Sequence, residues 1–153
     1  MRCDVFRMFP KVFTTASAVA LTIFTAVLAT AASPYAAPGQ KGGWNLPPEA
    51  PDTKNPLTVD AKILDAGKEI FNDKCQKCHG PKGLGDGPDA DPDHMEEMNL
   101  TNPKRADRNP DGIVFYKVSN GRSRPKMPAF KEELSTEQIW AVVSYVQTLR
   151  KKQ

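Results

Sequence analysis

The stretch Cys75-Gln76-Lys77-Cys78-His79-Gly80 (CQKCHG) determines how the rest of this 153-residue chain is interpreted. It places two thiols three residues apart, with an imidazole directly after the second thiol. Several chemistries use closely spaced thiols, and each makes different demands on the surrounding sequence. The residues on either side of the stretch therefore discriminate between them.

Three of these chemistries are poorly supported. A zinc site needs two further ligands, but the only other cysteine, Cys3, lies near the N-terminus, and His94 is the only other histidine. A thioredoxin-like redox pair expects a preceding strand, whereas a helical pattern precedes Cys75. A disulfide between Cys75 and Cys78 would close a very short loop and stabilise the fold very little. Neither the redox pair nor the disulfide explains His79.

A covalently attached haem explains all three side chains. Thiols at positions i and i+3 lie on one side of a helical turn, where they can add to the two vinyl groups on one edge of the porphyrin. The imidazole at i+4 then reaches the iron. The motif predicts one haem c, bound through Cys75 and Cys78, with His79 as an iron ligand.

The second iron ligand is predicted to be Met127. It lies between Lys126 and Pro128 in the segment RPKMPAF, and the proline restricts the backbone beside the thioether. A methionine in this position fills the iron's coordination and favours electron transfer over ligand binding. His94 is the alternative ligand.

The roles of Met95 and Met98 stay open. Both methionines belong to an acidic run, and packing over the haem edge is the simplest role for them.

Three helices are predicted from apolar spacing and from capping residues. The first follows Asp60 and runs into the CQKCHG stretch. The second has Asn109 as its cap and ends before Gly121. The third opens with a capping box formed by Ser135 and Gln138.

Residues 80–110 are rich in Gly, Pro and Asp and show no sustained periodicity, so one or two ordered loops are predicted there. No segment shows the alternation of a strand. The fold class expected is therefore all-α, with three to four short helices and long loops wrapped around the haem. The cofactor would supply core that so small a domain lacks.

The N-terminus carries an export signature. Arg2, Arg7 and Lys11 precede an uncharged run over residues 12–32, which predicts a signal peptide at residues 1–32, cleaved between positions 31 and 37. The run is also long enough to act as an uncleaved membrane anchor. Either alternative predicts a periplasmic location, soluble or tethered to the outer face of the cytoplasmic membrane.

Residues 33–56 are rich in Pro and Gly and predict an extended, poorly ordered linker, followed by the haem domain at 57–153. Trp44 in the linker is expected to be solvated or loosely packed, and docking to a partner is the alternative. Removal of residues 1–37 takes away three basic residues and one acidic residue, and the net charge falls from +3 to +1. Nucleic acid is therefore not an expected partner.

The order of these features resembles that of class I c-type cytochromes. The matching features are the series Gly67-x-x-x-Phe71-x-x-x-Cys75-x-x-Cys78-His79-Gly80, the loop GLGDGP, the segment KMPAF and a final helix with Trp140 and Tyr145. The resemblance covers residues 60 to about 150. It implies that Gly67, Phe71 and Tyr145 form the contact between the first and last helices, and that the carbonyl of Pro88 accepts the His79 N–H.

The function expected is electron transfer by a monohaem carrier that passes single electrons between respiratory redox proteins, without catalysis. The alternatives are a dedicated haem subunit of a dehydrogenase or reductase complex and a five-coordinate haem sensor. Six basic residues near the expected haem edge could steer an acidic partner, but acidic residues crowd the neighbouring loop. The six are Lys74, Lys77, Lys82, Arg122, Arg124 and Lys126. The sign of the partner's charge stays open.

Overall fold

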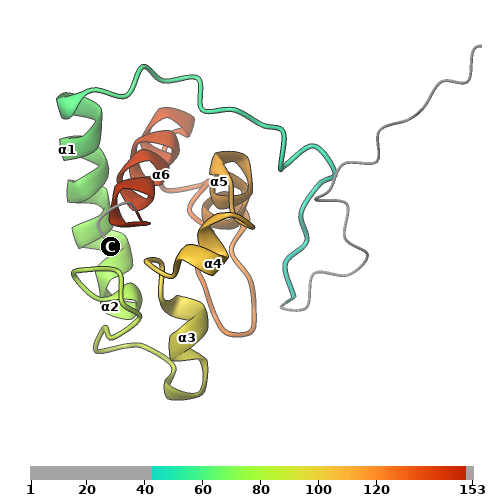
Figure 1. Cartoon of the computed structure of the whole chain (residues 1–153), viewed down its shortest axis with the longest axis vertical. Coiled ribbons are helices and arrows are strands. Elements are labelled where there is room, and N and C mark those ends of the chain that lie inside the picture. Colours follow the sequence, from blue (N-terminus) through green and yellow to red (C-terminus); the bar gives the residue numbers. More distant parts are fainter. Residues whose placement is uncertain (1–42, 151–153) are drawn as a thin grey trace, which may run out of the picture. The chain divides into compact units, whose positions relative to one another are not determined.

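A computed structural model describes residues 43–150, so the predicted signal peptide and the first part of the predicted linker lie outside the described residues. Within 43–150 the chain forms helices and loops without a strand, which confirms the all-α prediction. The three longest helices are α1 (Ala61–Ile70), α5 (Asp111–Asn120) and α6 (Thr136–Arg150), and Figure 1 shows α6 between α1 and α5. None of the helices in this described range is long and apolar enough to cross a membrane.

The first helix leads directly into the cysteine motif, as predicted. The Asp60 carboxylate accepts a hydrogen bond from the Ile63 N–H at 2.9 Å and so caps α1. The helix then continues through a π-helical turn, η1 (Phe71–Cys75), into α2 (Gln76–His79). The π turn was not predicted, because a single widened turn leaves no periodic signal in the sequence.

The contact between α1 and α6 also follows the prediction. A Cβ added at Gly67 would lie 2.1 Å from the carbonyl oxygen of Ala141, so only glycine permits this approach of the two backbones. The rings of Phe71 and Tyr145 pack beside it, with centroids 5.4 Å apart. This crossing fixes α1, and with it the cysteine motif, against the C-terminal helix.

The predicted caps of the other two helices have different outcomes. Ser135 and Gln138 form the predicted capping box: the Ser135 N–H donates to the Gln138 side chain, and the Gln138 N–H donates to the Ser135 hydroxyl. For α5 the predicted cap is wrong, because Pro110 occupies that position and the Asn109 side chain donates to the Arg105 carbonyl instead. The predicted end at Gly121 is confirmed.

Residues 80–110 contain more helix than predicted. A 3₁₀ turn, η2 (Pro92–His94), leads into α3 (Met95–Met98), and α4 (Pro103–Ala106) follows. Side chains of Asp91 and Asn102 accept backbone N–H groups at the starts of η2 and α4. Single turns like these are too short to show a 3.6-residue period, so the sequence predicted only loops here.

The described part of the predicted linker, residues 43–56, packs on the helices. Ala50 is fully buried, and a Cβ added at Gly112 would lie 2.2 Å from its carbonyl oxygen, so only glycine permits this contact. The Asn55 amide donates to the Ser144 hydroxyl of α6 at 2.8 Å. In Figure 1 this segment runs from the start of α1 past the ends of α6 and α5. Residues 47–53 also form hydrogen-bonded turns, so this segment is ordered on the helices, contrary to the expectation of an extended, poorly ordered tether.

Candidate functional site

The residues predicted to bind the cofactor line one cavity of about 280 Å³. Cys75, Cys78, His79 and Met127 all contribute to its wall. The remaining wall includes much of the hydrophobic core, namely Phe71, Val114, Val118, Phe130, Val142 and Val146. Protein interiors rarely leave voids much larger than a water molecule, so a cavity of this size through the core indicates a binding site.

The two thiols lie in different kinds of helical turn. Cys75 ends the π turn and Cys78 lies in α2. Burial raises the pKa of the Cys75 thiol to about 12, and the nearby Cys78 and Asp73 contribute. Burial, followed by the charge of Asp89, also raises the pKa of Cys78. The folded surroundings therefore disfavour the reactive thiolate, and we expect any covalent attachment at these sulfurs to precede closure of this wall.

The imidazole of His79 is oriented by a backbone carbonyl. Its Nδ1 lies 2.7 Å from the carbonyl oxygen of Met98, so Nδ1 donates and Nε2 is left to bind a metal. Burial lowers the pKa of His79, and the charge of Arg122 lowers it further, while the bond to Met98 acts in the opposite direction. The ring is therefore held neutral, which is the form that ligates iron. The predicted carbonyl, that of Pro88, was wrong.

The loop after the motif holds the helix end by backbone hydrogen bonds. The N–H groups of Gly85, Gly87 and Asp89 donate to the carbonyls of His79, Cys78 and Lys77, at 2.8, 3.3 and 2.8 Å respectively. The last carbonyls of a helix have no partner within it, and here the loop supplies three. The glycine-rich segment is thus a cap that fixes the position of the motif.

Met127 is held in a closed loop on another part of the wall. The N–H and carbonyl groups of Arg122 and Met127 bond each other in both directions at 2.9 Å. Gly121, which precedes this pair, has a φ of +59°, in the region that favours glycine. The Phe130 N–H then donates to the Val118 carbonyl at 3.0 Å and ties the loop to α5.

The other candidate ligands are arranged differently. His94 and Met95 do not belong to the cavity wall; His94 lies 3.9 Å from Asp91, and Met95 is 45% exposed. Met98 does line the cavity and is buried, but its carbonyl holds His79, which places its backbone on the histidine's side. Met127 is thus the lining methionine whose backbone takes no part in orienting His79.

Of the six basic residues predicted near the haem edge, four line the cavity. Lys74, Lys77, Arg122 and Lys126 line the cavity, whereas Lys82 and Arg124 do not. Ion pairs also neutralise two of these four, Lys74 and Arg122. Lys74 pairs with Asp73 and Glu133, at 3.3 and 3.4 Å. Arg122 pairs with Glu97 at 2.8 Å, and its side chain is only 7% exposed, so it is not a surface steering residue.

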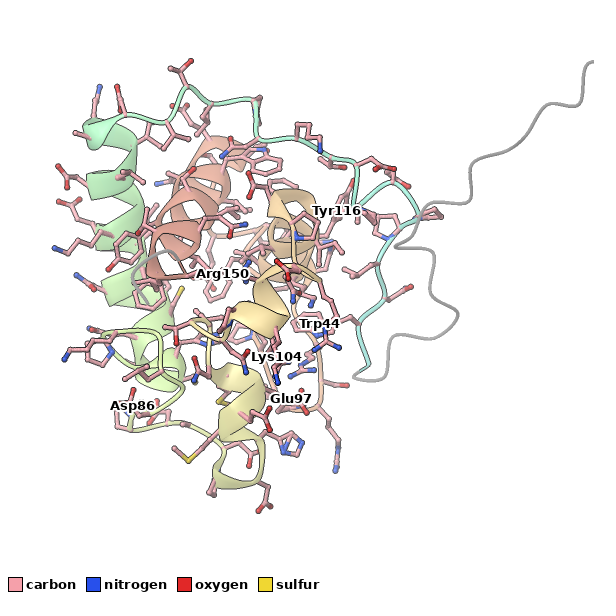
Figure 2. All side chains as sticks on the ribbon, in the orientation of Figure 1. Trp44, Asp86, Glu97, Lys104, Tyr116 and Arg150 are labelled. Carbon is pink, nitrogen blue, oxygen red and sulfur yellow. The ribbon has the colours of Figure 1, made fainter. Side chains whose placement is uncertain are left out.

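Trp44, expected to be solvated or loosely packed, instead contacts two cationic side chains at the cavity. Its ring lies 5.0 Å from the Nζ of Lys117 and 4.6 Å from the Cζ of Arg122, measured to the ring centroid, and it lines the cavity. Trp44 and Arg150, both labelled in Figure 2, bring opposite ends of the described chain to the same cavity. No local sequence pattern around Trp44 indicates that it contacts residues more than 70 positions away.

Comparison with known families agrees with this geometry. A family model described as Cytochrome c matches residues 64–150, more than half of the chain, and all four residues predicted to hold the cofactor fall within the match. The chain belongs to the cytochrome c family. As a c-type cytochrome it carries covalently attached haem c with iron, and the Cys75–Cys78 pair fits the family's C-x-x-C-H motif.

A solved structure with a similar chain is that of the Kuenenia stuttgartiensis reducing HAO-like protein complex Kustc0457/Kustc0458. The two chains are 28% identical, with a TM-score of 0.48. The match covers 63% of the cytochrome and 49% of that chain, so it spans about half the length of its relative.

The residues of the cytochrome fit its cofactor. The wall of one cavity carries the sulfurs of Cys75 and Cys78, the thioether of Met127 and the imidazole of His79, whose Nδ1 is already hydrogen-bonded to the Met98 carbonyl. Buried aliphatic and aromatic side chains form much of the remaining wall, as an apolar macrocycle requires. This donor set matches haem and does not resemble a zinc site, which would need additional thiolate or imidazole ligands.

Proposed function

We propose that this cytochrome is a one-electron carrier whose iron is ligated by His79 and Met127. The observation that carries the proposal is that both side chains line the same cavity as Cys75 and Cys78 but are held by separate parts of the chain. When bound, the haem supplies a reversible one-electron couple at iron. No acid or base is needed for such a function.

The protein's own residues would restrict the cofactor to this role. His79 stays neutral and correctly oriented because of burial and the Met98 carbonyl. The loop closed by Arg122 and Met127 holds the thioether at the cavity wall, where it would exclude small ligands from the iron. Buried side chains shield the cofactor from water, and electron exchange with redox protein partners would occur at the cavity mouth.

The exchange of Met127 for alanine tests the assignment. The oxidised wild-type protein should show the weak red charge-transfer band of an iron–thioether bond, and Met127→Ala should abolish it while the covalent haem is retained. Carbon monoxide should bind slowly to the reduced wild-type protein and rapidly to the variant. Met95→Leu and Met98→Leu are matched controls that should keep the band.

Two outcomes would contradict the proposal. A charge-transfer band that survives in Met127→Ala would exclude Met127 as the ligand. Rapid binding of carbon monoxide by the wild-type protein would instead favour a five-coordinate sensor.

We also propose that the protein works outside the cytoplasm. The proposal rests on the basic residues and the uncharged run that precede position 33. The mass of the mature protein should equal that of a chain cleaved between positions 31 and 37 plus one haem. A mass that includes residues 1–32 would instead support a retained anchor.

A further inference from the structure

The cavity wall carries a large excess of positive charge. Its lining includes seven basic residues but only two acidic ones, Asp89 and Glu97. The basic residues are Lys74, Lys77, Arg105, Lys117, Arg122, Lys126 and Arg150. Buried or half-buried cations are costly unless anions or hydrogen bonds compensate them. Three of the seven, Lys74, Lys77 and Lys126, are exposed, but Arg105, Lys117, Arg122 and Arg150 are half-buried. These four favour a negative partner that the described residues supply only in part.

Lys117 shows this imbalance most clearly. Its ammonium group donates to the side-chain oxygen of Asn109, which is neutral. Burial lowers the pKa of Lys117 to about 8, and the charges of four arginines on α4, α6 and the neighbouring loops lower it further; they are Arg105, Arg122, Arg150 and Arg108. Every charged group that shifts this lysine is thus positive. A nearby carboxylate would remove the conflict.

The arginines around Lys117 bond mainly to carbonyl oxygens. Arg105 donates to the Glu96 carbonyl at 2.9 Å. Arg150 donates to the carbonyls of Asn109 and Leu100, at 2.8 and 3.2 Å. Arg122 does have a carboxylate partner, Glu97. Carbonyl bonds orient these guanidinium groups but add no negative charge. The carboxylate of Asp111 acts on Arg150 and raises its pKa against the larger effect of burial, so the charge of this cluster is compensated only in part.

Trp44 covers this cluster of cations. It belongs to residues 43–56, the N-terminal arm, which packs on the helices. Its ring accepts the cationic groups of both Lys117 and Arg122, at 5.0 and 4.6 Å from its centroid. The buried Ala50 and the hydrogen bond from Asn55 to Ser144 anchor the arm on the helices. Figure 2 labels Trp44 and Glu97, which each contact Arg122. A ring in this position shields charge inside the cavity from water.

We propose that Lys117, together with Arg105, Arg122 and Arg150, forms a carboxylate-binding site that takes the two propionate groups of the attached haem, and that Trp44 closes this site. Each propionate brings one negative charge to a wall that has too few. The proposal rests on the covalent haem and not on the identity of the sixth ligand. Its failure and that of the Met127 assignment are therefore distinguishable.

The test compares Lys117→Gln with Lys62→Gln in the haem-loaded protein. Lys62 lies exposed on α1, so its exchange makes the same charge change away from the cavity. In Lys117→Gln the propionate bending bands in the resonance Raman spectrum should shift. The midpoint potential should fall, because loss of a nearby positive charge favours the oxidised iron. Lys62→Gln should change neither, and Lys117→Arg should restore the potential.

A second pair of variants tests whether Trp44 closes the carboxylate-binding site. Trp44→Ala should shift the propionate bands toward those of a hydrated carboxylate, whereas Trp44→Phe, which keeps an aromatic ring, should change them less. Haem content and far-UV circular dichroism identify the folded variants. If Lys117→Gln does not fold, Lys117→Arg and the Trp44 pair still decide the question.

Three outcomes would overturn the proposal. Unchanged propionate bands in folded Lys117→Gln would show that the lysine does not bind them. Equal shifts in Lys117→Gln and Lys62→Gln would indicate a general charge effect. A wild-type midpoint potential that responds to added succinate, but not to the same ionic strength of chloride, would show that the site takes a free carboxylate instead.

Discussion

The two sides of the haem cavity are built differently. On the histidine side, residues 75–98, three consecutive carbonyls of the motif accept loop N–H groups, and a fourth carbonyl, that of Met98, orients His79. On the methionine side, residues 121–131, Arg122 and Met127 bond each other, and the N–H groups of Phe130 and Lys131 tie the following segment to α5 through the carbonyls of Val118 and Ser119. The histidine and its motif are thus fixed directly by four hydrogen bonds, whereas the backbone of Met127 itself is fixed by the two bonds to Arg122. We expect the methionine side to open first.

The largest effect should come from removing the two cysteines that attach the haem, because both sides of the cavity depend on it. The double variant Cys75→Ser, Cys78→Ser should lose its haem and most of its helical far-UV circular dichroism, because α1 and α5 have ten residues each and such helices are marginal without packing. A haem-free double variant with stable helices would show that the polypeptide core suffices. The single variant Cys78→Ser, which keeps one possible thioether, is the control.

The next effect should come from the histidine side. A Cβ on Gly87 would lie 2.2 Å from the carbonyl oxygen of Lys77, so Gly87→Ala must push the loop off the motif. We expect a loss of about 3 kcal/mol in the free energy of unfolding, near the upper end for overpacking. Denaturant titration of the haem-loaded protein measures it. Leu84→Ala, at an exposed position of the same loop, should change stability by less than about 0.5 kcal/mol.

A smaller loss of stability should follow from the matching change on the methionine side. Gly121→Ala places a side chain at a φ of +59°, and its Cβ would meet the Met127 carbonyl at 2.3 Å. With a ψ of −168° this backbone conformation is nearly restricted to glycine, and the strain is about 2 kcal/mol if the loop opens to relieve the clash. The charge-transfer band should weaken while the haem stays attached. Ser123→Ala, exposed in the same loop, should leave the band intact. If Gly121→Ala disturbed the histidine side as much as the methionine side, the expectation that the methionine side opens first would be wrong.

The smallest effect concerns the ion pair between the two sides. The hydrogen bond from Arg122 holds the pKa of Glu97 below its ordinary value of 4.5. A depressed carboxylate pKa stabilises the fold above the unfolded value, and this contribution is lost as pH falls through the folded pKa. Glu97→Gln should therefore cost less than about 1 kcal/mol near neutral pH and nothing in strong acid. Thermal unfolding against pH, with Glu96→Gln as the control, measures the difference. A cost that persists in strong acid would rule out this ion pair as its source.

Features carried by side-chain pattern could be predicted from the sequence. The C-x-x-C-H motif led to the haem, Asp60 and the Ser135–Gln138 pair marked two helix starts, and the spacing of Gly67 with its aromatic partners marked the crossing. The placement of Met127 on the same cavity wall as His79 also agrees with expectation, although its bond to iron stays a prediction. Each of these features leaves a residue type at a particular spacing.

Features carried by the backbone or by distant contacts could not be predicted. The carbonyl that orients His79 belongs to Met98, and a carbonyl has no signature in the sequence, so the choice of Pro88 by resemblance was wrong. Trp44 meets Lys117 and Arg122 only because the arm folds back over the cavity. Asn109 resembles a helix cap but binds the neighbouring turn, because Pro110 leaves it outside the helix.

The π-helical turn at Phe71–Cys75 sets how tolerant this part of the chain is to changes in length. Its Gln76 N–H reaches back to the Phe71 carbonyl, which accommodates one more residue than an α-helical turn does. Deletion of Asn72 or Asp73, both exposed, would therefore leave an ordinary α-helical turn, with the motif facing the cavity as before. Insertion of one more residue would instead turn the thiols and the imidazole by about 100°, away from the cavity. This turn can thus lose an exposed residue more easily than it can gain one.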